Sequence, residues 1–234
     1  MLKHQAVRDH VLALLRDGLE PHERIPTERD LSAQLGVSRL TVRRAVEQLV
    51  HERVLYRIQG SGTFVAEPLI RKGSDLTSFS EDMRERGRIP STRVLQVEHV
   101  VAGAFEGWRL GVSPGEPLHH LTRLRLADGR PMCLEEVWLV ASLTPGLTER
   151  DLTGSLYDTL REAYRIEPES AEQEVRATVL DEGQAGLLEV PTLSPAIVVE
   201  RVTFDAKGRA YELGVSRYRG DRYSLTLTLT RHHD

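Results

Sequence analysis

Three arginines gather in one short segment, residues 37–45, which reads VSRLTVRRA. The apolar residues in and after this segment recur at the spacing of one buried helix stripe; they are Val42, Ala45, Val46 and Leu49. Arg39, Arg43 and Arg44 lie off that stripe. In the first turn of a helix, Arg39 can give two hydrogen bonds to guanine O6 and N7, worth roughly 1–3 kcal/mol of discrimination. Helix stability does not explain Arg39, because an arginine at a helix N-terminus opposes the helix dipole.

The charge of the chain is unevenly distributed. The formal net charge of all 234 residues is -4. Residues 1–66 nevertheless hold ten Lys and Arg against eight Asp and Glu, so the acidic excess lies in the remainder. A slightly basic N-terminal part on an acidic body indicates that only the N-terminal part meets a polyanion.

Helix-capping residues and helix-breaking glycines predict the elements that position the arginines. Apolar spacing predicts a helix over 4–17, which Gly18 ends. Thr27 can cap a second helix that Gly36 breaks, and Ser38 can cap a third that runs to about Val50. Two short helices joined by a tight turn containing glycine form a helix-turn-helix.

A hairpin follows the third helix. The stretch VLYRIQGSGTFVA has two β-prone runs around residues 59–62, QGSG. Three helices followed by a hairpin make a winged helix-turn-helix, and the glycines allow the hairpin tip to approach a nucleic-acid backbone closely.

This first part of the chain resembles the DNA-binding domain of GntR-type bacterial transcription regulators. Over residues 4–66 it carries, in order, the motifs PTER, VSRLTVR and GSGTF. The resemblance implies that Arg29, Arg39 and Arg43 contact DNA and that Gly60 approaches the minor groove. One departure is Arg53, which stands where the family usually has glycine. The expected DNA-contacting residues are Arg29, Ser38, Arg39, Thr41, Arg43, Arg44, Gly60 and Gly62.

The second part changes character. Strand-like runs occur at 92–101, 117–127, 130–140, 170–180, 196–205, 209–219 and 223–230, and helices are expected near 78–86, 103–110, 155–164 and 182–189. Asp128-Gly129 and Lys207-Gly208 predict tight hairpins. The expected fold class is therefore α+β, with a winged helix-turn-helix domain at 1–66, a linker at 67–75 and an antiparallel-sheet domain at 76–234.

Polar residues of this second domain fall into pairs that could meet a ligand. Ser78 and Glu81 form a capping box at a helix start, where free N–H groups can bind an anion. Strand alternation places the members of each further pair on one face; these pairs are Arg123 with Arg125, Cys133 with Glu135, and Glu212 with Tyr218. Ser155 and Tyr157 open another helix. Taken singly, each pair is an ordinary surface or cross-strand feature.

The motifs LTSFSEDM, LTRLRLADGRPMCLE, GSLYD and YELGVSRYRGDRYSL resemble the effector-binding UTRA domain, of chorismate-lyase-like fold, in the HutC subgroup of GntR regulators. The likeness extends to repressors of N-acetylglucosamine utilisation. It implies that a phosphosugar's phosphate is held at Ser78, Phe79, Arg123, Ser155 and Tyr157, and its sugar at Glu135, Glu212 and Tyr218. The expected effector is a phosphorylated amino sugar; a non-sugar organic acid is the alternative.

Enzyme interpretations are weaker. Residues 111–115, GVSPG, match a nucleophile-elbow pattern, but Pro114 lacks the N–H that an oxyanion hole needs. Glu135 and Glu136 face opposite ways on a strand, and so do His119 and His120. A residual activity of the lyase-like fold is the remaining enzyme alternative. We expect no enzyme, no cofactor and no metal site, His232-His233-Asp234 included.

The composition indicates the cellular compartment of the protein. A single cysteine, Cys133, excludes an internal disulfide and fits a reducing compartment. No apolar run is long enough to span a membrane, and the start lacks the apolar stretch of a signal peptide. We therefore expect a cytoplasmic homodimer that binds an inverted-repeat operator. The winged helix-turn-helix domain, or head, of each subunit binds one half-site.

Overall fold

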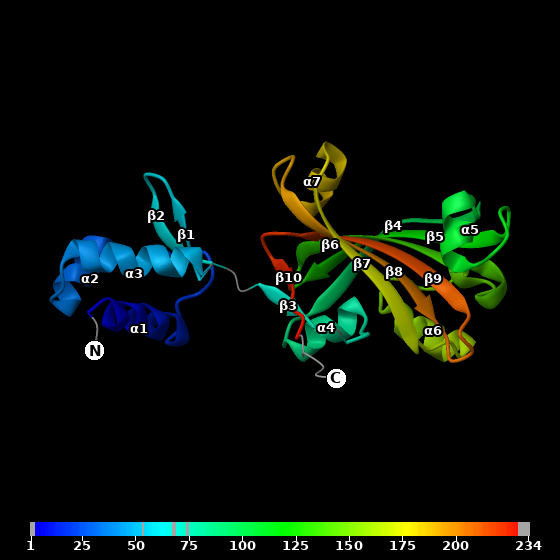
Figure 1. The fold of residues 1–234 in the computed structure, drawn as a ribbon, viewed down its shortest axis with the longest axis horizontal. Coiled ribbons are helices and arrows are strands. Elements are labelled where there is room, and N and C mark those ends of the chain that lie inside the picture. The colour runs from blue at the N-terminus through cyan, green and yellow to red at the C-terminus, as the bar shows by residue number, and fades with distance from the viewer. Residues whose placement is uncertain (1–2, 53, 67–68, 74, 229–234) are drawn as a thin grey trace, which may run out of the picture. The chain divides into compact units, whose positions relative to one another are not determined.

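The computed structural model describes residues 3–52, 54–66, 69–73 and 75–228. The chain divides into two compact units, Met1–Leu69 and Ile70–Asp234, which are shown in Figure 1. None of the described helices is long and apolar enough to cross a membrane. Arg53 and His232-His233-Asp234 lie outside the described residues.

The first unit is a winged helix-turn-helix. Its elements are α1 (Lys3–Arg16), α2 (Glu28–Leu35), α3 (Arg39–His51), β1 (Leu55–Ile58) and β2 (Gly62–Val65). The predicted caps are confirmed: the side chain of Thr27 accepts from Asp30 N, and that of Ser38 from Thr41 N. Gly36 ends α2 in the left-handed conformation, with φ 62°. The predicted buried stripe of α3 packs against α1, α2 and the hairpin in one core.

The second unit contains a six-stranded antiparallel sheet in the order β4-β5-β6-β9-β8-β7. Its strands are β4 (Pro90–Val101), β5 (Pro117–Ala127), β6 (Arg130–Val140), β7 (Ser170–Val179), β8 (Pro195–Phe204) and β9 (Ala210–Arg219). Asp128 and Gly129 both have positive φ, which closes the β5–β6 hairpin as predicted.

Helices cover both faces of this sheet. They are α4 (Phe79–Glu85), α5 (Ala104–Leu110), α6 (Leu156–Tyr164) and α7 (Glu182–Leu188), with short 3-10 turns η1 (Ala141–Leu143) and η2 (Leu147–Glu149). Leu156 and Leu160 of α6 pack on Leu121 and Val137 on one face. Buried residues of α5 and α7 pack on the other face. Figure 1 shows α5 and α7 on the side of the sheet opposite to α6.

Two expectations at the ends of this unit are wrong. Residues 70–72, placed in the linker 67–75, form strand β3 (Ile70–Lys72), which pairs in parallel with β10 (Tyr223–Leu225). The strand predicted over 223–230 ends at Leu225, and residues 226–228 are not strand. The short β3–β10 ladder buries Ile70 and Tyr223 beside α4. Packing of these two residues, rather than periodicity over three positions, explains why β3 forms.

Candidate functional sites: a nucleic-acid interface and a ligand pocket

In the first unit, one groove runs between the α2–α3 pair and the wing. Arg29, Arg39, Gly60 and Gly62 of the expected DNA-contacting set line it. The Arg29 side chain is 80% exposed, and Gly60 and Gly62 have φ of 77° and 134°. A conformation with positive φ favours glycine, so the wing tip carries no side chain at these two positions. Gln59 and Ser61 of the tip also line the groove, as does Glu28 among the arginines.

The remaining residues of that set are not among those that line the groove. Ser38 and Thr41 share a hydroxyl hydrogen bond of 2.9 Å at the start of α3. Arg43 donates to Glu28 Oε2 from Nε and Nη2, at 3.2 and 3.1 Å. Arg44 is exposed on α3. Glu28 thus fixes the direction of Arg43 before any partner binds.

Two groove arginines were missed from sequence. Arg24 and Arg57 line the same groove, and Arg57 Nη2 donates to Glu28 Oε1 at 3.2 Å. A Cβ at Gly62 would lie 2.6 Å from Arg24 Nε. Both arginines lie outside the recognition helix, so helical periodicity gave no signal. Arg57 lies on β1 of the wing, and Arg24, between α1 and α2, is placed by its bridge to Phe64 of β2.

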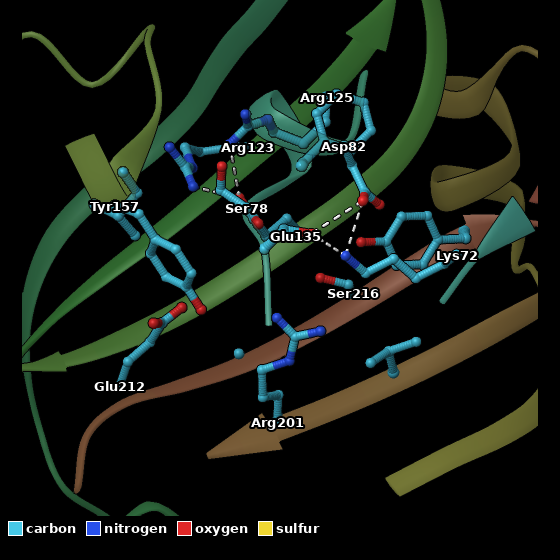
Figure 2. Close-up of a pocket in the computed structure, with 16 residues that line it drawn as sticks. Lys72, Ser78, Asp82, Arg123, Arg125, Glu135, Tyr157, Arg201, Glu212 and Ser216 are labelled. Carbon is cyan, nitrogen blue, oxygen red and sulfur yellow. Dashed lines mark hydrogen bonds and ion pairs between the residues drawn. The ribbon is translucent and has the colours of Figure 1, made fainter. Parts of the chain in front are cut away.

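In the second unit, the sheet face under α4 and α6 holds a pocket with about 610 Å³ of empty space, including the part open to solvent. Seven of the eight expected effector-binding residues line it: Ser78, Phe79, Arg123, Glu135, Tyr157, Glu212 and Tyr218. Ser155 does not, because its side chain caps α6 by accepting from Asp158 N. Figure 2 shows the labelled side chains converging from several strands and helices.

Strand register explains this convergence. Arg123 of β5 pairs with Glu135 of β6, Glu135 with Ser216 of β9, and Ser216 with Val199 of β8. Alternate residues of β9 share the pocket face, so small Gly214 lies between larger neighbours. Small side chains in the middle of the sheet leave the space of the pocket, and longer side chains around them form its walls.

The strongest charges of the pocket are arginines that share one carboxylate. Arg123 is 1% exposed, and its Nη2 donates to Glu135 Oε2 at 2.5 Å. Arg123 Nε and Nη1 are buried with no hydrogen-bond partner among the described residues. Arg125 donates to the same Glu135 oxygen at 3.4 Å and to the Ser80 hydroxyl at 2.8 Å. Two guanidiniums and one carboxylate leave an excess positive charge and unused donors, which an anion would satisfy.

The pKa values of the two glutamates move in opposite directions. Burial alone would raise the pKa of Glu135, but Arg123 and Arg125 outweigh it and hold that pKa below its ordinary value. Burial, with the neighbouring Glu135 carboxylate, raises the pKa of Glu212 to about 7. Glu212 Oε2 is also buried without a hydrogen-bond partner among the described residues. Glu135 is therefore a fixed acceptor, whereas Glu212 is partly protonated at neutral pH.

The Glu212 shift predicts how stability changes with pH. Between the unfolded value of 4.5 and the folded value of about 7, the folded state binds more protons than the unfolded state. The free energy of unfolding must then fall as pH rises through this window, by about 1–3 kcal/mol from this group. We expect Glu212→Gln to remove this loss, so that its melting temperature exceeds that of the wild type at pH 8 more than at pH 5. An equal difference at both pH values would contradict the assignment.

The start of α4 forms the wall beside the arginines. The predicted capping box is confirmed: Ser78 Oγ accepts from Glu81 N, and Ser78 N donates to Glu81 Oε2 at 2.7 Å. The Ser78 amide is therefore already engaged. An anion at this helix start would meet the N–H groups of Phe79 and Ser80, which have no intrahelical carbonyl partner.

Three further charged residues of the pocket were missed from sequence: Lys72, Asp82 and Arg201. Lys72 is buried on β3, and its Nζ lies 2.9 Å from Asp82 Oδ1 and also donates to the Thr77 hydroxyl. Lys72 lies within the expected linker, where no periodicity marks it as buried. Arg201 lies on β8, and only the strand order reveals that β8 borders the pocket.

A winged helix-turn-helix with an arginine-lined groove, joined to an antiparallel-sheet module with a cationic pocket, defines a DNA-binding transcription regulator with a ligand-binding domain. Comparison with known families agrees. Residues 3–65 match the bacterial regulatory proteins of the gntR family, and residues 85–224 match the UTRA domain. The chain belongs to the GntR family and carries a UTRA effector domain.

Individual relatives span nearly the whole chain. The chain is 34% identical to the HTH-type transcriptional repressor NagR of Bacillus subtilis over 214 residues, 91% of this chain and 88% of that protein. It is 33% identical to the mannosyl-D-glycerate transport/metabolism system repressor MngR of Escherichia coli, covering 93% and 91%. The crystal structure of PhnF from Mycobacterium smegmatis superposes with a TM-score of 0.76 at 30% identity, over 97% of this chain and 100% of that one.

These comparisons confirm the predicted α+β two-domain fold and the GntR resemblance. They also favour a regulator over the enzyme alternatives, because the relatives named are transcription regulators.

Proposed function

We propose that this chain is a cytoplasmic, homodimeric repressor whose heads bind an inverted-repeat operator and whose UTRA pocket binds a small phosphorylated effector, an amino-sugar phosphate. The observation that carries the effector class is the buried Arg123 guanidinium, with two unused donors, beside Arg125 in a pocket. The names of the relatives support the repressor role, and one of them refers to a sugar derivative, mannosyl-D-glycerate.

The expected DNA-contacting residues act together at the groove in this proposal. Arg39, at the first turn of α3, reads a base edge in the major groove, while Arg43 and Arg44 reach phosphates or base edges one turn later. Arg29 contacts the same groove or its backbone, and Gly60 brings the wing tip to the minor groove.

Phosphate suits the arginine side of the pocket. A phosphate dianion accepts several charge-assisted hydrogen bonds at once, and the forked guanidinium of Arg123 can supply two from atoms that now lack partners. Phe79 and Tyr157 also line the pocket, and the Tyr157 hydroxyl lies 3.5 Å from Thr203 Oγ1. In this proposal Ser155 caps α6 and thereby positions Tyr157. It does not itself hold the phosphate, although the family resemblance implies that it does.

Sugar hydroxyls suit the opposite side. Glu135 and the ionised form of Glu212 are acceptors, and protonated Glu212 is also a donor. Tyr218 stacks on Tyr223, with ring centroids 3.9 Å apart, so its ring is fixed at the wall. Rigid acceptors at set positions favour a polyhydroxylated ligand over a simple organic acid.

A homodimer requires a self-complementary surface, and the sheet offers an exposed edge. β7 is the outer strand beyond β8, and most of its residues are exposed, including Val175 and Val179. An exposed edge strand is a ready template for pairing with another strand. This edge is the favoured dimer contact in our proposal.

The pocket touches the first element after the DNA-binding unit. That unit ends at Leu69 and β3 begins at Ile70. Lys72 of β3 lines the pocket and is held by Asp82. An anionic effector competes with Asp82 for the Lys72 ammonium, so occupancy of the pocket acts on the strand that leads directly to the head.

Lys72→Met should therefore uncouple the two sites. We expect the variant to bind operator as the wild type does and to bind effector with at most a tenfold loss, but to lose the 5- to 150-fold effect of effector on operator affinity that is typical of allosteric coupling. Calorimetry with effector and fluorescence anisotropy with operator, at saturating effector, measure the two quantities separately. Lys207→Met, on the exposed β8–β9 hairpin, is the matched control. A coupling factor equal to that of the wild type would contradict this role.

A thermal-shift screen of the full chain tests the effector class. The panel contains amino-sugar phosphates, hexose phosphates, the unphosphorylated sugars, organic acids and inorganic phosphate, each with and without operator DNA. A ligand at 100 times its dissociation constant stabilises the folded state by about 2.7 kcal/mol. We expect a clear rise in melting temperature with amino-sugar phosphates and none with the unphosphorylated sugars. A rise with an organic acid alone would contradict the proposed class.

A further inference from the structure

The second residue of α3 is an exposed leucine. Leu40 is 59% exposed, whereas Val42, Ala45, Val46 and Leu49 form the buried stripe of the same helix. That stripe belongs to the core of the first unit, and Leu40 lies outside this core. Packing of the fold therefore does not explain why a large apolar side chain stands at this position.

Helix geometry places Leu40 on the outward side of α3. Leu49 follows it by nine residues, which is two and a half turns, so the two side chains point in opposite directions. Residues three, four and seven positions further on share the face of Leu40; they are Arg43, Arg44 and Glu47, and all three are exposed. Leu40 is thus the first residue of a polar, mainly cationic face.

Duplex DNA offers a particular partner to an apolar side chain on such a face. The recognition helix of a helix-turn-helix enters the major groove with its N-terminal residues first, and the arginines of α3 suit the negative charge of DNA. A leucine cannot replace water at a phosphate, which needs a hydrogen-bond donor. In the major groove, however, thymine presents an apolar C5-methyl group. The exposed leucine and this methyl group fit each other chemically.

Two other side chains of the first unit could supply an apolar contact, but neither is placed as well. Thr41 carries a methyl group, yet it is half-buried and its hydroxyl shares a hydrogen bond of 2.9 Å with Ser38 Oγ. Ile58 is 46% exposed, but it lies on β1 of the wing, which our proposal directs to the minor groove. The minor groove presents no methyl group. Leu40 is therefore the best-placed candidate for a thymine contact.

We propose that Leu40 is a specificity-determining residue, whose side chain packs on the C5-methyl of a thymine within two base pairs of the guanine that Arg39 contacts. This inference rests on the proposed function, which places α3 in the major groove. Neighbouring Cα atoms are about 3.8 Å apart, and successive bases of one strand are about 3.4 Å apart along the duplex axis. Adjacent residues of the first turn therefore reach the same or nearby base pairs.

Replacing thymine with uracil in a selected operator tests this contact. Duplexes enriched from a random pool by binding to the full chain supply the operator, and each thymine in turn is replaced by uracil, which lacks only the C5-methyl. Loss of one buried methyl group changes an equilibrium constant by about fourfold. We expect one thymine in each half-site to show this loss, and roughly 15-fold weaker binding when both are replaced. Fluorescence anisotropy at fixed salt measures the ratio.

Variants at Leu40 assign the methyl effect to this side chain. In Leu40→Ala the ratio between the thymine and uracil duplexes should fall to about one, whereas Leu40→Met, which retains an apolar contact, should keep most of it. Because Leu40 lies outside the core, the melting temperature of both variants should equal that of the wild type. Leu193→Ala removes a leucine that is 67% exposed in the second unit; it is the matched control and should keep the wild-type ratio.

The possible failures of this test are distinguishable. A selected operator at which no uracil replacement weakens binding, or a uracil effect that persists in Leu40→Ala, would overturn the role of Leu40 while leaving sequence-selective DNA binding in place. Failure of the selection to enrich any sequence would instead overturn the proposed function and this inference together.

Discussion

Arg39→Ala is expected to abolish discrimination between the operator and random DNA while leaving effector binding unchanged. Arg39 lines the groove at the first turn of α3, where an arginine can read guanine with two hydrogen bonds worth roughly 1–3 kcal/mol. A dimer on two half-sites uses this contact twice, so the affinity for the specific site should fall by roughly 30-fold or more. Anisotropy titrations with operator and with scrambled duplex, at fixed salt, measure the ratio directly.

The matched control for this prediction is Arg16→Ala. Arg16 is an exposed arginine at the end of α1 that does not line the groove, so its removal takes away the same charge without the base contact. Loss of a non-specific phosphate contact would weaken all duplexes alike. Operator discrimination that survives in Arg39→Ala would refute the assignment of α3 as the recognition helix.

Arg123→Ala is expected to leave operator binding intact and to remove the response to effector. Its guanidinium is buried with two unused donors, and charge-assisted hydrogen bonds to a bound phosphate are worth about 1.5–3 kcal/mol each. Two such bonds predict a loss of effector affinity of roughly 100-fold or more. Operator release as a function of effector concentration measures this loss as a shift of the midpoint.

Arg123→Ala also removes a partner of Glu135, so a second variant is needed. Arg123→Lys keeps the positive charge but lacks the fork, and it should show an intermediate shift of the midpoint. Melting curves without effector show whether either variant is folded. A folded Arg123→Ala protein that still responds at wild-type effector concentrations would mean that the pocket is assigned to the wrong place.

Local chemistry made most of the fold predictable. Thr27, Ser38 and Ser78 cap helices where a hydroxyl precedes an apolar period, and each of these caps forms as expected. The Asp128-Gly129 turn fixes the β5–β6 register, which in turn brings Arg123 and Glu135 together. Such features depend on a few neighbouring residues, so they can be predicted without knowing any contact between distant parts of the chain.

The missing parts of the site depend on distant pairings. β3 was placed in a linker because three residues show no period, and its pairing partner lies more than 150 residues further along the chain. The sequence around Lys72 therefore did not predict that this residue is buried. Arg201 reads as an ordinary strand residue until the order β6-β9-β8 places it across from Arg123. Ser155, expected in the pocket, is instead directed to its own helix end by capping.

The central claim is that duplex DNA binds at the arginine-lined groove of the winged helix-turn-helix and that the UTRA domain controls this binding. The most direct measurement is the affinity of the purified full chain for genomic DNA fragments of its source organism, over a salt series, with and without an amino-sugar phosphate. We predict site-selective binding that weakens steeply with salt, because phosphate contacts release counter-ions, and a 5- to 150-fold change on adding effector. Binding that is equal for all fragments, or independent of both salt and effector, would contradict the account.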